Sequence, residues 1–145
     1  MFVSQTTSAI LALATNKERS MNLFFDEPFT GHAGGSLSFK IECDALTSPD
    51  YATLARLVAN RFTFRSVHGI PSGGLAFAHA LEPYWTQDGQ FDLIVDDVYT
   101  TGRSMNDFRH EQSVENPLGI VVFARGPIRE SWVYPFFMLH SLFYE

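Results

Sequence analysis

Apolar runs and amphipathic stretches alternate along most of the chain. Three apolar segments, at residues 64–70, 91–95 and 118–124, are separated by helix-like stretches that begin at Leu75 and Ser104. This order is typical of parallel strands joined by right-handed crossovers. We therefore expect an α/β fold in which helices flank a central, mainly parallel sheet. Ligands of such sheets bind at the carboxyl ends of the strands.

The region before the first apolar run has two periodicities of its own. Between residues 10 and 14, apolar side chains recur at helical spacing and predict a short first helix. Further on, Phe39, Ile41 and Cys43 alternate with charged residues. A period of two predicts a half-buried strand over residues 38–44.

A helix is expected directly after this strand. Ser48 provides a capping hydroxyl, Pro49 suits the first helical position, and Asp50 lies near the positive end of the helix dipole. The apolar residues that follow at helical spacing form a predicted buried stripe: Leu54, Leu57, Val58 and Phe62.

Composition limits the classes of protein to which the chain can belong. With 145 residues and 46% hydrophobic composition, residues 1–145 are expected to form a single domain. The net charge of −6 and the ten scattered basic residues argue against a nucleic-acid partner. Cys43 is the only cysteine, which excludes an intrachain disulfide and suits a reducing cytoplasm. The apolar patch near the N-terminus is too short to span a bilayer, so we expect a cytoplasmic protein without a membrane segment.

The most informative stretch is LIVDDVYTTGRSM at residues 93–105. An apolar strand leads into Asp96 and Asp97 at the expected ligand-binding edge, where carboxylates need donors, a metal ion or a polyol. The Thr-Thr-Gly-Arg-Ser turn then opens a helix, whose N–H groups and hydroxyls can surround a phosphate. Each feature alone also has a structural explanation, because the acids can simply end a strand and Thr100 or Thr101 can cap a helix.

A second loop, Ile70-Pro71-Ser72-Gly73-Gly74, follows the preceding predicted strand. Its two glycines can bring backbone amides to the same edge of the sheet, in an arrangement suited to an anion. An ordinary strand-to-helix turn is the alternative explanation.

Both loops resemble motifs of the type I phosphoribosyltransferases, and Gly-Ile-Pro-Ser-Gly-Gly-Leu resembles the orotate phosphoribosyltransferase version. The resemblance implies that ribose 5-phosphate is transferred from phosphoribosyl pyrophosphate to orotate or a similar base, with Mg²⁺ as cofactor. It implies that the catalytic acids Asp96 and Asp97 face the ribose hydroxyls and hold the metal indirectly, through ribose or water. The implied 5-phosphate loop is Thr100, Thr101, Gly102, Arg103 and Ser104, and the implied pyrophosphate loop is Pro71, Ser72, Gly73 and Gly74.

The resemblance extends to the N-terminal half. Residues 29–36 (FTGHAGGS) are similar to the segment that opens the orotate site, which implies a small hood made from the N- and C-terminal segments. The base-binding residues implied in this way are His32, Lys40 and Arg125. A guanidinium suits a planar carboxylate, but Arg125 can instead be a solvated charge at a strand end, and His32 a polar loop residue without a ligand.

The chain departs from these enzymes between residues 75 and 90. Orotate phosphoribosyltransferases usually carry an extra strand and a mobile basic loop there, and this chain has no lysine after Lys40. Such a lid shields the reaction from water. A noncatalytic protein that binds phosphoribosyl pyrophosphate or a nucleotide is therefore the alternative function.

The aromatic stretch at residues 132–139 is expected to pack beneath the loop at residues 31–35. If it is exposed, it marks a subunit interface, consistent with a homodimer, which is common in the family. A third hypothesis follows from this stretch, namely an interaction module whose pocket has lost its ligand.

Overall fold

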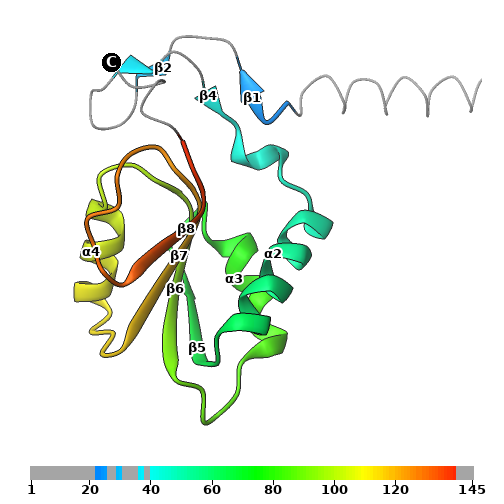
Figure 1. Cartoon of the computed structure of the whole chain (residues 1–145), viewed down its shortest axis with the longest axis vertical. Helices are drawn as coiled ribbons and strands as arrows, with labels where there is room; N and C mark the ends of the chain where they lie inside the picture. Colours follow the sequence, from blue (N-terminus) through cyan, green and yellow to red (C-terminus); the bar gives the residue numbers. More distant parts are fainter. Residues whose placement is uncertain (1–21, 26–28, 31–35, 38–39, 140–145) are drawn as a thin grey trace, which may run out of the picture.

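A four-stranded parallel sheet forms the centre of the molecule (Figure 1). The computed structural model describes residues 22–25, 29–30, 36–37 and 40–139, and the sheet lies in the last of these ranges. The strands lie side by side in the order β5-β6-β7-β8, and each neighbouring pair is parallel. The expected α/β fold with a mainly parallel sheet is confirmed. The strands are β5 (Phe64–Gly69), β6 (Phe91–Tyr99), β7 (Pro117–Ala124) and β8 (Val133–Met138).

Three α-helices of the described chain cover the two faces of the sheet. Helices α2 and α3 lie on one face and α4 lies on the other (Figure 1). No helix in the described ranges is both long and apolar enough to cross a membrane. The helices are α2 (Ser48–Arg61), α3 (Leu75–Leu81) and α4 (Arg103–Glu111), with short 3-10 helices η1 (Cys43–Ala45) and η2 (Glu82–Tyr84).

Strand β7 shows why the apolar runs are nearly continuous. Leu118, Ile120 and Val122 belong to the cluster that includes residues of α2 and α3. Val121 and Ala124 belong to a second cluster, which includes residues of α4. Parallel strands covered on both faces bury successive side chains, so a run without polar interruptions is the expected pattern.

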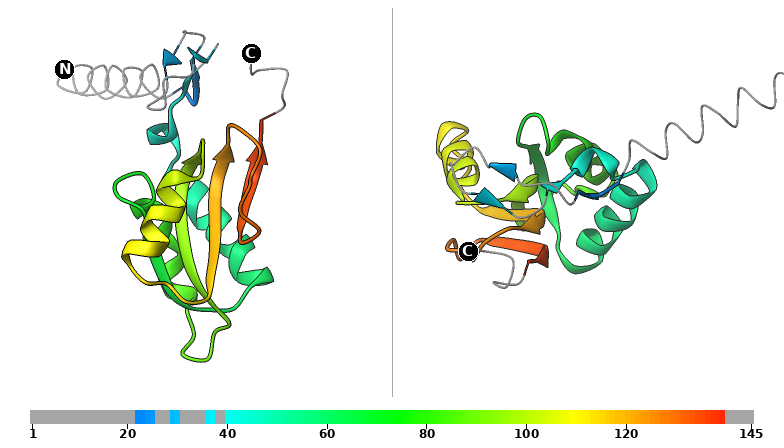
Figure 2. Two further views of the ribbon diagram at one scale, coloured as in Figure 1. Left: turned by 90° about the vertical axis from the view of Figure 1, so that its left-hand side faces the viewer. Right: turned by 90° about the horizontal axis from the view of Figure 1, so that it is seen from above.

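The described N-terminal residues form two short antiparallel pairs beyond the carboxyl ends of the main strands (Figure 2). The backbone N–H of Glu42 donates to the carbonyl of Leu23 at 2.7 Å. The Phe24 ring packs edge-on against Phe123 of β7, with ring centroids 6.5 Å apart. These contacts hold the N-terminal part of the expected hood over the carboxyl edge of the sheet. The pairs are β1 (Phe24–Phe25) with β4 (Lys40–Ile41), and β2 (Phe29–Thr30) with β3 (Ser36–Leu37).

The strand predicted over residues 38–44 is shorter than expected. Among the described residues of this segment, only Lys40 and Ile41 form a strand, and η1 begins at Cys43. The Glu42 carboxylate accepts from the Asp44 backbone N–H at 3.4 Å and caps this turn. Ile41, the last residue of β4, and Cys43, the first residue of η1, are both buried. The apolar alternation therefore predicted the burial of these residues correctly, but not the length of the strand.

Helix α2 is present, but its cap lies one residue earlier than predicted. Thr47, not Ser48, is the N-cap, and its hydroxyl accepts from the Asp50 N–H at 3.3 Å. The Asp50 carboxylate in turn accepts from the Thr47 N–H at 2.7 Å, which completes a capping box. Leu57 was wrongly assigned to the buried stripe, because its side chain is 49% exposed. The buried residues are Tyr51, Leu54, Ala55 and Val58.

The C-terminal stretch is a strand of the main sheet, which corrects its assignment to the hood. β8 pairs with β7 from Gly119↔Val133 to Ala124↔Met138. Phe136 packs against Phe77 of α3 at 6.3 Å, so part of the aromatic stretch belongs to the core. The predicted first helix, and the loop at residues 31–35 against which this stretch was expected to pack, lie outside the described residues.

Candidate functional site

Strand β6 carries both acids of the candidate site. The strand was expected to end before them, but its ladder with β7 continues through Asp96↔Val121 as far as Tyr99. Within the strand, the Asp97 N–H donates to Asp96 Oδ1 at 2.9 Å, and the Val98 N–H donates to Asp97 Oδ1 at 2.7 Å. Both carboxylates are therefore held by the backbone of a central strand, at its carboxyl end.

Gly73 brings the second predicted loop into contact with Asp97. A β-carbon added at Gly73 would lie 2.5–2.6 Å from all three atoms of the Asp97 carboxyl group. Backbone hydrogen bonds connect the two ends of this loop to each other and to β6. The Gly74 N–H donates to the Ile70 carbonyl at 2.8 Å, and the Ile70 N–H donates to the Val95 carbonyl at 3.0 Å. The peptide bond between Pro71 and Ser72 is cis. The structure thus brings together two segments that the sequence predicted separately.

The surroundings of Asp96 disfavour its charged form. Only 8% of the residue is exposed. Burial is the largest cause that raises its pKa, and the neighbouring charge of Asp97 adds to it, so the pKa reaches about 8. Burial, reinforced by the charge of Asp97, likewise raises the pKa values of Cys43 and Tyr51 to about 12. A cation or a hydrogen-bond donor that enters here would stabilise the Asp96 carboxylate.

The predicted 5-phosphate loop connects β6 to α4. Gly102 is the N-cap of α4 and has a left-handed φ of 84°. A side chain at Gly102 would also meet Glu130 and the Tyr99 hydroxyl. The Thr101 hydroxyl accepts from the Arg103 N–H at 3.4 Å. Thr100, Thr101, Arg103 and Ser104 are exposed, so the loop presents its polar groups outward at the start of a helix, which is the geometry that favours an anion.

Sequence reasoning did not identify three residues that hydrogen-bond to one another beside this loop: Tyr99, Asn106 and Glu130. The Tyr99 hydroxyl donates to Glu130 Oε2 at 2.6 Å, and Asn106 Nδ2 donates to Glu130 Oε1 at 2.6 Å. Glu130 lies 31 positions after Tyr99, in the segment between β7 and β8. No local pattern marks such a contact, because it depends on how two strand ends meet.

Of the three residues predicted to bind the base, Arg125 is the one that the structure describes in full. It directly follows β7, and its N–H donates to the Tyr99 carbonyl at 2.8 Å. It is only 6% exposed, so the interpretation as a solvated charge is wrong. Its charge lowers the pKa of Cys43, against the larger effect of burial. His32 lies outside the described residues, and of Lys40 only the backbone of β4 is described.

Direct metal coordination by the protein alone finds no support in the described ranges. No group of three His, Cys, Asp or Glu side chains there could hold a metal ion. Asp96 and Asp97 do present carboxylates side by side, and Mg²⁺ commonly binds through one or two carboxylates and keeps the rest of its shell as water or substrate oxygen. The described residues therefore fit an ion bound mainly by water and ligand.

Comparisons with known proteins identify the fold. No protein-family model and no curated protein sequence matches the chain. Orotate phosphoribosyltransferase from Aeropyrum pernix superposes with a TM-score of 0.64 at 18% identity, over 83% of this chain and 90% of that one. The Mycobacterium tuberculosis enzyme, solved with inorganic phosphate, gives 0.60 at 16% identity over 83% and 90%. The chain has the fold of the orotate phosphoribosyltransferases.

The same phosphoribosyltransferase fold is found in a larger protein. UMP synthase from Leishmania donovani gives a TM-score of 0.66 at 18% identity, over 83% of this chain. The chain spans only 34% of that protein. The resemblance stated from the sequence motifs is therefore confirmed at the level of the fold.

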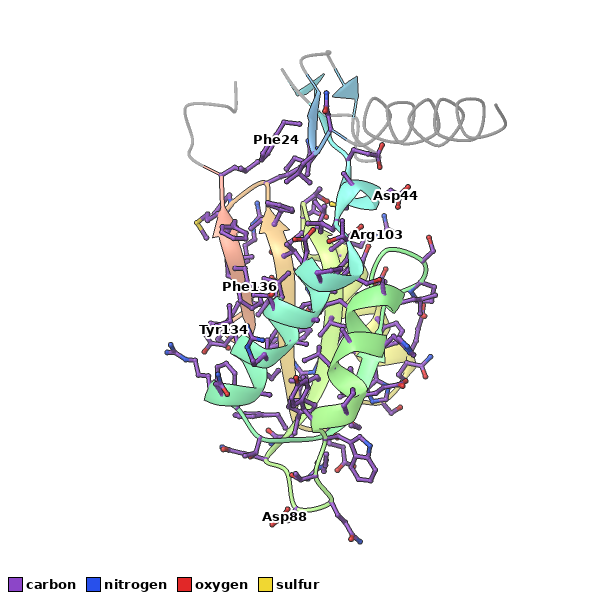
Figure 3. All side chains as sticks on the ribbon, turned by 90° about the vertical axis from the view of Figure 1, so that its right-hand side faces the viewer. Phe24, Asp44, Asp88, Arg103, Tyr134 and Phe136 are labelled. Atoms are coloured by element: carbon purple, nitrogen blue, oxygen red, sulfur yellow. The ribbon has the colours of Figure 1, made fainter. Side chains whose placement is uncertain are left out.

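The connection between α3 and β6 is short in this phosphoribosyltransferase fold, and every residue of it is described. After η2, the chain turns at residues 85–90, where the Thr86 N–H donates to the Phe64 carbonyl at 2.8 Å. Figure 3 shows Asp88, in this turn, at the opposite end of the molecule from Phe24 and Asp44. The connection thus lies at the amino edge of the sheet and does not cover the candidate site.

Proposed function

We propose that the chain is a phosphoribosyltransferase that transfers ribose 5-phosphate from phosphoribosyl pyrophosphate to a nitrogenous base, orotate or a similar pyrimidine, and releases pyrophosphate. The observation that carries the proposal is the contact between Gly73 and Asp97. It joins a loop suited to one anion to an acid pair suited to a polyol, beside a second anion-binding loop. Phosphoribosyl pyrophosphate has these three parts in this order.

In this proposal, the loop Thr100–Ser104 holds the 5-phosphate through its hydroxyls and backbone N–H groups at the start of α4. Asp96 and Asp97 accept hydrogen bonds from the ribose hydroxyls, for which carboxylates are good acceptors. The loop Pro71–Gly74 holds the pyrophosphate through its backbone. The sheet edge fixes all three segments relative to one another, which is the main requirement for a reaction that depends on positioning.

Mg²⁺ fits the proposed site through ribose and water, and it would neutralise the leaving pyrophosphate. The raised pKa of Asp96 supports this assignment, because burial and the Asp97 charge both disfavour a second bare carboxylate there. The protein itself supplies the two carboxylates and the loop that faces them.

The base is assigned to the side of Arg125. Arg125 is buried and directly follows β7, which brings a guanidinium to the carboxyl edge of the sheet, where it suits a planar carboxylate such as that of orotate. Transfer breaks the anomeric C–O bond to pyrophosphate and forms a C–N bond to the base nitrogen. The carboxylates of Asp96 and Asp97 stabilise the positive charge that develops on the sugar between these events.

One observation favours a second function, a noncatalytic protein that binds phosphoribosyl pyrophosphate or a nucleotide. The connection between α3 and β6 turns at the far edge of the sheet, so it cannot act as the lid that the resemblance leads one to expect. Without a lid, water has access to the reacting carbon, and transfer competes with hydrolysis.

Calorimetric titration with phosphoribosyl pyrophosphate, with and without Mg²⁺, tests the donor site that both functions share. Mg²⁺-dependent binding is expected, and absence of binding under both conditions contradicts both functions. Turnover of radiolabelled donor with a panel of bases then separates them. Release of pyrophosphate that requires a base supports the enzyme, whereas tight binding without release supports the noncatalytic protein.

A further inference from the structure

The segment between β7 and β8 forms hydrogen bonds to Tyr99, the last residue of β6, directly before the proposed 5-phosphate loop. The Tyr99 carbonyl accepts from the Arg125 N–H at 2.8 Å. The Tyr99 hydroxyl accepts from the Arg129 N–H at 3.3 Å and donates to Glu130 Oε2 at 2.6 Å. Tyr99 is therefore held at both its backbone and its side chain by one segment, directly before Thr100.

Glu130 also contacts the loop from its far side. Its Oε1 atom accepts from Asn106 Nδ2 at 2.6 Å, and the same amide donates to the Gly102 carbonyl at 3.0 Å. The carboxylate fills the space where a β-carbon of Gly102 would lie. Each carboxylate oxygen thus fixes one end of the loop, Oε2 through Tyr99 and Oε1 through Asn106.

We propose that Glu130 is a positioning residue, which holds the loop Thr100–Ser104 in the conformation that receives a phosphate before any ligand arrives. The proposal rests on the proposed function for the identity of the anion. The Glu130 carboxylate has its two oxygens occupied by donors of the protein, so it is not offered to substrate. It acts on the ligand through Tyr99 and Gly102.

Charge alone predicts the opposite effect. A carboxylate beside a phosphate site repels the dianion, so its removal should tighten binding. Loss of one of the two hydrogen bonds to this carboxylate, and of its charge, should instead release the loop and weaken binding, by about tenfold. The direction of the change therefore distinguishes positioning from simple electrostatics.

The experiment measures the affinity of the 145-residue chain for ribose 5-phosphate and, without ligand, the backbone amide resonances of Gly102–Ser104. Glu130→Gln removes the charge and one of the two acceptors. Asn106→Ala removes the donor to Oε1 from an exposed helix position and serves if Glu130→Gln does not fold. Glu111→Gln is the matched control, because it removes one exposed acid at the other end of α4.

We expect Glu130→Gln and Asn106→Ala to bind ribose 5-phosphate about tenfold more weakly, with shifted or broadened amide resonances of Gly102–Ser104 in the free protein. Glu111→Gln should change neither. Equal or tighter binding by Glu130→Gln overturns the proposal. If the wild-type protein binds no ribose 5-phosphate, the proposed function fails, and unchanged loop resonances in Glu130→Gln then overturn the role of Glu130 separately.

Discussion

Asp92 and Asp96 lie four positions apart on strand β6, and their pKa values are shifted in opposite directions. At its amino end, Asp92 accepts from Arg65 at 2.8 and 3.1 Å and from the Ser66 hydroxyl at 2.7 Å. The hydrogen bond from Arg65 is the largest cause of its lowered pKa. At the carboxyl end, burial and the charge of Asp97 raise the pKa of Asp96 to about 8.

The difference separates an acid that serves the fold from one that is suited to a ligand. Asp92 has its donors on the neighbouring strand β5, so its charge is stabilised by folding itself. Ionisation of Asp96 is unfavourable because of burial and the charge of Asp97. A ligand with hydroxyl groups, or an associated cation, would stabilise the ionised form. The same strand thus has a structural end and a candidate functional end.

The strongest test removes the acid pair of the functional end. Asp96→Asn/Asp97→Asn should weaken binding of phosphoribosyl pyrophosphate with Mg²⁺ by about 100-fold, because two charge-assisted hydrogen bonds are lost. Calorimetry measures the affinity, and Asp92→Asn is the matched control, since it removes a carboxylate from the same strand. An unchanged affinity of the double variant, or an equal loss in Asp92→Asn, would show that the two ends do not differ in this way.

A second test uses the pH dependence of stability. The raised pKa of Asp96 means that the folded protein binds more protons than the unfolded chain between pH 3.8 and about 8. Stability from this group is therefore complete below that range and is lost as pH rises through it. Asp96→Asn should flatten the decline and raise the free energy of unfolding at pH 8 by roughly 2 kcal/mol. Denaturant unfolding of both proteins from pH 4 to 9 measures the effect, and parallel curves would refute it.

A third test disturbs the contact between the two loops without removing a charge. In Gly73→Ala, the new β-carbon forces the Asp97 carboxylate away from the Val98 N–H that it now accepts from. We expect affinity for phosphoribosyl pyrophosphate to fall about tenfold, because the displaced carboxylate loses a charge-assisted hydrogen bond. The melting temperature should change little, since Gly73 lies at the surface of the site. Gly126→Ala is a suitable control, because its β-carbon would meet only an ordinary contact at 3.4 Å. Unaltered binding in Gly73→Ala would separate the two loops functionally.

The sequence predicted the parts of the molecule that depend on local chemistry. The acid pair, the glycine loop at Gly102 and the turn at Gly73 each follow from side-chain type and spacing within a few residues. The parallel sheet follows from apolar runs separated by helices. The structure then shows Asp97 facing Gly73, which no single segment could reveal.

What the sequence did not predict depends on long-range contacts. Glu130 supports a loop 26 to 30 positions earlier, and nothing in its neighbours marks it. β8 was not predicted as a strand of the main sheet. It lies at the edge of that sheet, where a proline such as Pro135 is tolerated, whereas central strands exclude it. Leu57 fits the helical period of α2 but lies beyond the width of the face that the sheet covers.

The smallest expected effect belongs to the structural end of β6. Asp92→Asn should lower the free energy of unfolding at pH 7 by about 1 kcal/mol, because Arg65 and Ser66 lose a charged acceptor at a partly exposed site. The lowered pKa of Asp92 gives stability that is present above its ordinary value of 3.8 and is lost as pH falls below it. The stability deficit of Asp92→Asn should therefore shrink toward pH 3 and grow as pH rises, whereas Asp96→Asn should become more stable than the wild type as pH rises. If Asp92→Asn and Asp96→Asn change the free energy of unfolding with the same sign at pH 8, the two ends of the strand are not electrostatically distinct.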